Sequence, residues 1–170
     1  MDTIKIMNDY INNKLQASDK ACADDGINGK AFEVAIRSYI MNRIAKQVKP
    51  QGKTDIRFTM NGKRFTCEIK TACGEIETAE ANQYIIYCAD VDTSFPAEEQ
   101  GYVFTREQWQ AFINGYTGRG KFLRADNRGH LHIQSFYVSE TKRPKASKPI
   151  ARYIEEVLFD MPTVEEFFNK

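Results

Sequence analysis

The sequence predicts a single α+β domain in which helices flank one mixed central β-sheet. Apolar residues recur at helical spacing near both ends of the chain, whereas polarity alternates in the middle as it does in strands. A length of 170 residues with 42% hydrophobic composition suffices for one core and is short for two. We therefore expect residues 29–138 to form the core, with helices added at residues 3–16 and 150–168.

Two amphipathic helices are expected in the first fifty residues. Apolar side chains share one helical face over residues 3–16 and again over residues 30–48. Asn28 is a suitable N-cap for the second helix, and Pro50 ends it. The apolar positions are Ile4, Met7, Ile11 and Leu15 in the first helix, and Phe32, Ile36, Tyr39, Ile40 and Ile44 in the second.

A β-hairpin follows these helices. Residues 55–60 and residues 64–70 both alternate in polarity, and the dipeptide Asn61-Gly62 stands between them. Asparagine and glycine both accept a positive φ, so this dipeptide is a strong signal for a tight hairpin turn. We expect two antiparallel strands in which the numbers of facing residues sum to about 123.

Later elements are predicted from local signals. Residues 84–89 are apolar on both faces, as a central strand would be, and residues 101–104 form another strand. Thr105 and Gln108 have the spacing of a capping box and open a helix. The remaining expectations are a short helical turn at residues 78–83, a second hairpin formed by residues 121–124 and 130–138, and closing helices at residues 150–159 and 163–168.

Three residues of the first hairpin carry the most informative chemistry. Glu68 and Lys70 are two apart in a strand, so both side chains project from the same sheet face. In the expected register Asp55 faces Glu68, and the two carboxylates converge. Adjacent carboxylates repel unless a cation joins them, and Mg²⁺ prefers such oxygen ligands. A lysine beside the metal would prepare a water molecule or stabilise charge on a phosphate, so the pattern predicts phosphodiester hydrolysis.

This arrangement resembles the PD-(D/E)XK nuclease superfamily. Asp55 is followed thirteen positions later by Glu68-Ile69-Lys70 and is preceded by a helix that carries Glu33. The resemblance spans residues 29–90 and implies a restriction-endonuclease-like fold. It also implies Asp55 and Glu68 as catalytic Mg²⁺ ligands, the Ile69 backbone carbonyl as a third ligand, Lys70 as the base or water-orienting group, and Glu33 as an accessory catalytic acid. Mn²⁺ would substitute for Mg²⁺.

The chain also departs from the family pattern. Thr54 stands where the family has proline, and the connection over residues 71–83 is shorter than the helix that the family places there. Gln83 and Tyr87 match a Gln-x-x-x-Tyr element of one branch of the family. Two structural alternatives remain open. Glu68 and Lys70 would form the solvated face of an edge hairpin, and Glu33 would form an ordinary helical ion pair with Arg37.

A basic segment complements this predicted site. The whole chain carries a net charge of only +1, but residues 119–152 hold nine cationic and two acidic side chains. Such a local excess is typical of a surface that binds phosphates, and DNA is the expected partner. The candidate DNA-binding residues are Arg119, Lys121, Arg124, Arg128, Lys142, Arg143, Lys145 and Lys148.

The sequence therefore predicts a metal-dependent endonuclease that acts on DNA. No apolar run is long enough to cross a membrane, and the four cysteines form no Cys-x-x-Cys pair, so we expect a cytoplasmic protein. The resemblance to the superfamily implies a protein of the bacterial or phage kind. One site makes one incision per visit, so a homodimer is expected for cutting two strands. The alternatives are a non-catalytic module on the same fold that binds nucleic acid or protein, and an inhibitor whose acidic residues mimic nucleic acid.

Overall fold

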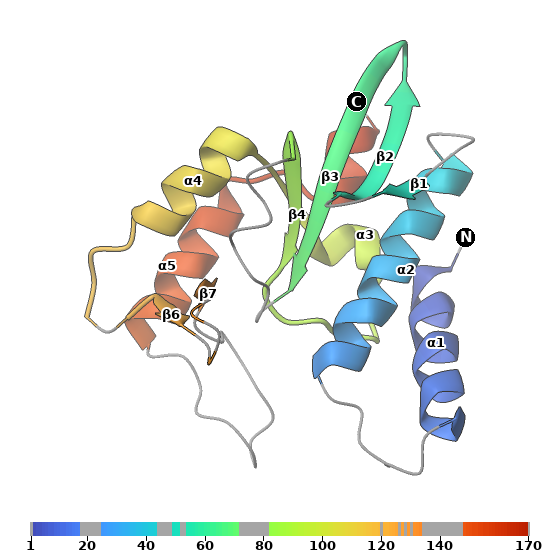
Figure 1. Cartoon of the computed structure of the whole chain (residues 1–170), viewed down its shortest axis with the longest axis horizontal. Helices are drawn as coiled ribbons and strands as arrows, with labels where there is room; N and C mark the ends of the chain where they lie inside the picture. The colour runs from blue at the N-terminus through green and yellow to red at the C-terminus, as the bar shows by residue number, and fades with distance from the viewer. Residues whose placement is uncertain are drawn as a thin grey trace.

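The computed structural model describes most of the chain and confirms an α+β architecture with a mixed sheet (Figure 1). It describes residues 2–17, 25–43, 49–51, 54–71, 82–119, 121–125, 127, 129, 131–133 and 148–169. The main sheet has five strands in the order β1-β2-β3-β4-β5, and β6 and β7 form a separate pair. The strands are β1 Lys49–Gln51, β2 Thr54–Met60, β3 Lys63–Thr71, β4 Tyr84–Cys88, β5 Tyr102–Thr105, β6 Leu123–Ala125 and β7 Leu131–Ile133. The helices are α1 Thr3–Ala17, α2 Asp25–Arg43, α3 Ala97–Gln100, α4 Arg106–Asn114, α5 Lys148–Phe159 and α6 Val164–Phe168.

The predicted hairpin of β2 and β3 is confirmed, including its register. Asn61 and Gly62 have φ angles of 52° and 76°, as a turn with two left-handed residues requires. Ile56 faces Cys67 and Phe58 faces Phe65, so the residue numbers sum to 123 in both pairs. The chain's own turn chemistry therefore sets which residues of β2 and β3 face each other.

The other strands make the sheet mixed. β4 is parallel to β3 and antiparallel to β5, and its nearly complete burial confirms the central strand predicted there. The capping box of Thr105 and Gln108 is present at the start of α4, and β6 and β7 pair as the predicted second hairpin. The expected turn at residues 78–83 falls largely outside the described residues.

The core lies on both faces of the five-stranded sheet. One face packs against α1, α2, α3 and α6, and the other packs against α4, α5 and the pair of β6 and β7 (Figure 1). Alternation along β3 divides its side chains between the faces, with Cys67 and Ile69 on the α2 side. The helices expected as additions at the two ends belong to the core itself, because Met7 of α1 and Val164 of α6 are fully buried.

Three local expectations differ from the structure. α2 begins at Asp25 instead of residue 30, so Asn28 lies inside the helix and is not its N-cap. β1 and α3 were not predicted. The early start of α2 has a tertiary cause, because Ile27 packs on the core and Gly29 lies so close to β3 that a Cβ there would be 3.0 Å from Thr71 Oγ1. This packing outweighs the low helix propensity of the two glycines.

Gly101 lies in close contact with residues of α2, β4 and α6, and this crowding allows a specific prediction. A Cβ at this buried position would lie 2.8 Å from Phe32 Cζ and 3.2 Å from Ile86 Cγ2. Gly101→Ala is therefore expected to lower the free energy of unfolding by about 1–3 kcal/mol through overpacking. Urea denaturation measures the loss. Adding Phe32→Leu should return part of it, and an unchanged urea midpoint in Gly101→Ala would show that no such crowding exists.

Among the helices that the structure describes, none combines the length and the apolar character that a membrane-spanning helix needs.

Candidate functional site

Glu68 and Lys70 form a buried ion pair on the α4 and α5 side of the sheet. Lys70 Nζ lies 3.6 Å from Glu68 Oε1, and the two residues are only 6% and 7% exposed. Their partners in the parallel ladder are Tyr87 and Ile85, which belong to the apolar core on that side. The predicted common face is confirmed. The alternative of a solvated edge is wrong, because β3 lies between β2 and β4 in the sheet and both side chains are buried.

Asn82 joins this pair and was missed by the sequence analysis. Its Nδ2 donates to Glu68 Oε2 over 3.2 Å, and the residue is fully buried. The interaction holds one carboxylate oxygen while the other faces Lys70. The only signal in the sequence is a polar residue just before the predicted strand 84–89. The parallel register of β3 and β4, which brings Asn82 to Glu68, cannot be read from a local pattern.

In the part of the chain that the structure describes, these three residues account for most of the buried polar side chains. Within the described residues, buried polar or charged side chains occur at Thr3, Glu68, Lys70 and Asn82. Thr3 has a structural role, because its hydroxyl donates to Glu98 and accepts from the Ala97 amide. Burial of a charge costs several kcal/mol per ion even when the charge is paired, so an ion pair in a core contributes little net stability. A buried Glu–Lys–Asn cluster is therefore a candidate functional site.

Asp55 occupies the expected place along β2, although its side chain lies outside the described residues. It directly precedes Ile56, whose partner on β3 is Cys67, and Glu68 directly follows Cys67. If the register of the hairpin continues by one residue, Asp55 is opposite Glu68. Among the described side chains, no group of three His, Cys, Asp or Glu residues could hold a metal ion. The carboxylate of Glu68 is the type of oxygen group that Mg²⁺ prefers, and Ile69 follows Glu68 in β3.

Glu33 lies on the other side of the sheet. Arg37 donates to its Oε1 over 3.0 Å, and Lys30 donates to its Oε2 over 3.3 Å. The buried residues of α2 pack with Cys67 and Ile69, and therefore on the face opposite to Glu68 and Lys70. The structure thus gives Glu33 the helical ion pair that was the alternative to a role as accessory acid.

Gln83 holds β3 and β4 in register. Its side-chain Oε1 accepts from the Thr66 amide over 3.3 Å, and its own amide donates to Thr66 Oγ1 over 3.1 Å. Tyr87 is a fully buried residue of β4. The two residues of the Gln-x-x-x-Tyr element therefore lie along one edge of β3. Gln83 helps to align β3, the strand that carries Glu68 and Lys70.

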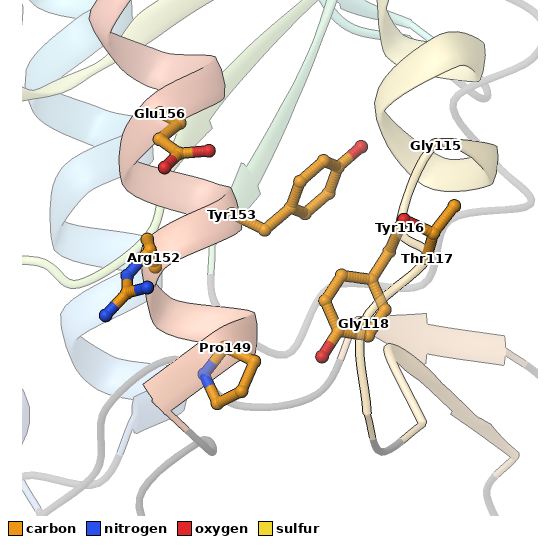
Figure 2. Close-up of a pocket in the computed structure, with 8 residues that line it drawn as sticks. All are labelled: Gly115, Tyr116, Thr117, Gly118, Pro149, Arg152, Tyr153 and Glu156. Atoms are coloured by element: carbon orange, nitrogen blue, oxygen red, sulfur yellow. The ribbon is translucent and has the colours of Figure 1, made fainter.

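The predicted DNA-binding residues are described only in part. Arg119 and Lys121 are exposed in the connection between α4 and β6. Arg124 lies in β6 and Lys148 begins α5, but their side chains lie outside the described residues, as do the whole of Arg128, Lys142, Arg143 and Lys145. Beside Arg119, the segment 115–118 and the first turns of α5 enclose a pocket that the sequence did not predict (Figure 2).

Cys67 and Cys88 are buried free cysteines. Burial raises the pKa of both thiols to about 12, so neither is activated as a nucleophile at neutral pH. Cys22 and Cys73 lie outside the described residues.

Comparison with known proteins returns no match among family models, curated proteins or solved structures.

Proposed function

We propose that this protein is a metal-dependent nuclease that hydrolyses phosphodiester bonds in DNA, acting as an endonuclease. The observation that carries the proposal is the buried pair of Glu68 and Lys70, in the hairpin where Asp55 directly precedes the pairing of Ile56 with Cys67. A carboxylate and an ammonium held together in a core are costly for folding, and their retention is explained if they perform chemistry.

The order of elements supports a restriction-endonuclease-like core. Helix α2 precedes the antiparallel hairpin of β2 and β3, and β4 is parallel to β3. The resembling residues Asp55, Glu68 and Lys70 lie on that hairpin in the order that the PD-(D/E)XK superfamily uses. Glu33 is left out of the proposed site because Arg37 and Lys30 engage it on the opposite face.

Each residue of the proposed site has a distinct task. Asp55 and Glu68 would hold Mg²⁺, with the Ile69 carbonyl as a further ligand, and the metal would supply Lewis-acid activation of water and phosphate. Lys70 orients the attacking water and stabilises the negative charge that develops on the phosphate. Asn82 holds Glu68 Oε2, so the carboxylate keeps one orientation while its other oxygen faces Lys70.

Cleavage of plasmid and single-stranded DNA by the purified protein tests the proposal. We expect nicking in the presence of Mg²⁺ or Mn²⁺, none with chelator, and none with the variant Asp55→Asn. The substitution Lys63→Met, at the exposed first residue of β3, serves as a control that should keep full activity. Metal-independent cleavage, or unchanged cleavage by Asp55→Asn, would disprove this assignment. DNA binding without cleavage would favour the alternative of a non-catalytic nucleic-acid-binding module.

A further inference from the structure

A pocket of about 260 Å³ lies outside the proposed catalytic pair, between the segment 115–118 and α5. Figure 2 shows it open toward the viewer, with α5 on one side, the segment that follows α4 on the other, and the sheet behind. On the α5 side it is lined by Pro149, Arg152, Tyr153 and Glu156. Its lining therefore combines aromatic rings, one cation and one anion.

The walls of the pocket are held in place by contacts within the protein. Tyr153 donates its hydroxyl to the Phe112 carbonyl over 2.6 Å and stacks on the Phe112 ring at an interplanar angle of 15°. A Cβ at position 115 would lie 2.8 Å from the Tyr153 hydroxyl, so the close approach of the segment to α5 requires Gly115. Tyr116 donates its hydroxyl to the Arg119 carbonyl. The pocket is thus shaped before any ligand arrives, which reduces the entropy cost of binding.

The lining residues suit a planar base that carries a phosphate. Tyr116 and Pro149 approach the pocket from opposite sides and supply flat apolar surfaces (Figure 2). Arg152 and Glu156 are exposed on α5 one turn apart, and within the described residues neither forms an ion pair. A guanidinium binds a phosphate well, and a carboxylate accepts hydrogen bonds from the N–H groups on the edge of a base.

The volume of the pocket and the charges near it narrow the range of ligands further. Pockets for drug-sized molecules occupy roughly 300–1,000 Å³, so a pocket of about 260 Å³ admits one base and excludes a duplex. Arg119 and Lys121 are both exposed and follow, along the chain, the segment that lines the pocket. Cations near the pocket favour a ligand that carries a phosphate.

We propose that this pocket binds a single nucleotide, with the base between Tyr116 and Pro149, its edge toward Glu156 and its phosphate on Arg152. A planar base joined to a phosphate occurs both in a free nucleoside monophosphate and in an unpaired nucleotide of a nucleic-acid strand. The site is separate from Glu68 and Lys70, so the inference does not depend on the proposed cleavage activity. In a nuclease, such a pocket would hold one nucleotide of the substrate away from the cleaved bond.

Titration calorimetry of the full-length protein in chelator tests this inference without any contribution from a metal. The ligands are the four nucleoside 5′-monophosphates, the matching nucleosides, inorganic phosphate and a 5′-phosphorylated tetranucleotide. We expect a monophosphate to bind at least tenfold more tightly than its nucleoside or than phosphate alone. Tighter binding of the tetranucleotide than of the monophosphate would identify a strand as the source, and the reverse order would identify a free nucleotide.

Variants at exposed positions assign the contacts without disturbing the core. Arg152→Gln should weaken monophosphate binding about tenfold and leave nucleoside binding unchanged, whereas the remote control Arg64→Gln should change neither. Glu156→Gln should reduce the difference in affinity among the four bases, and its exposed neighbour Glu155→Gln should not. Absence of binding by every ligand, equal affinity for phosphate and monophosphate, or full affinity in Arg152→Gln would overturn the proposal.

Discussion

The variant Lys70→Met is expected to lose metal-dependent DNA cleavage and to lower the free energy of unfolding by about 3–5 kcal/mol. The loss of stability follows from burial, because Glu68 is 7% exposed and would remain in the core without the cation that now lies 3.6 Å away. The loss of activity follows from the proposed task of Lys70, and groups that assist a water or proton in this way contribute roughly 10²–10⁴-fold in rate. Urea denaturation and plasmid cleavage measure the two effects separately.

A double variant separates these effects. Glu68→Leu combined with Lys70→Met removes both charges, so we expect stability within about 1 kcal/mol of the parent chain or above it. The double variant should nevertheless remain inactive, because it lacks both the proposed metal-binding carboxylate and the proposed catalytic ammonium group. Recovery of cleavage in the stable double variant would refute the catalytic role of the pair. Equal destabilisation of the single and double variants would show that the uncompensated charge is not the source of the cost.

A second large effect is expected at Phe104, in the aromatic core behind the same sheet face. Phe104 is fully buried, and its ring centroid lies 5.4 Å from those of both Trp109 and Phe112. Phe104→Ala should lower the free energy of unfolding by about 3–5 kcal/mol, because it removes apolar contact and leaves a cavity that a packed core fills only in part. Trp109 is the single tryptophan of the chain and is 3% exposed, so its fluorescence follows unfolding directly.

The matched control for Phe104 is Phe159, at the end of α5. Phe159 is 89% exposed, so the same truncation to alanine should change the free energy of unfolding by less than about 0.5 kcal/mol. Phe104→Leu should cost less than Phe104→Ala because it keeps most of the side-chain volume. A similar loss in Phe104→Ala and Phe159→Ala would show that the aromatic core does not hold the domain together in the way we infer.

Features that depend on neighbouring residues in the chain, such as the hairpin turn and the cap of α4, were predicted correctly from the sequence. The register of β2 and β3 follows from the backbone preferences of Asn61 and Gly62, and the start of α4 follows from the side chains of Thr105 and Gln108. Such signals act over a few residues and need no distant partner. The shared face of Glu68 and Lys70 was predictable for the same reason, since alternation is a property of any strand.

Long-range contacts decided what the local patterns left open. Thr71 and Gly29 come together across the fold, and this packing accompanies a start of α2 earlier than its glycine-rich sequence indicates. The role of Glu33, as an accessory acid or as a member of a helical ion pair, depended on which face of the sheet α2 covers. The spacing of apolar residues along a helix does not predict that face. The α2 face proved to be the one opposite to Glu68 and Lys70.

Local patterns were therefore enough to predict the α+β class, the hairpin and the three residues on which the proposed chemistry depends. The burial of Glu68 and Lys70, the hydrogen bond from Asn82 to the carboxylate and the pocket beside α5 arise from packing in the folded chain. The physical reason is the range of the interactions. Turns, caps and alternation are set by neighbours in the chain, whereas burial and convergence arise from the parallel pairing of β3 with β4 and the packing of α5 against α4.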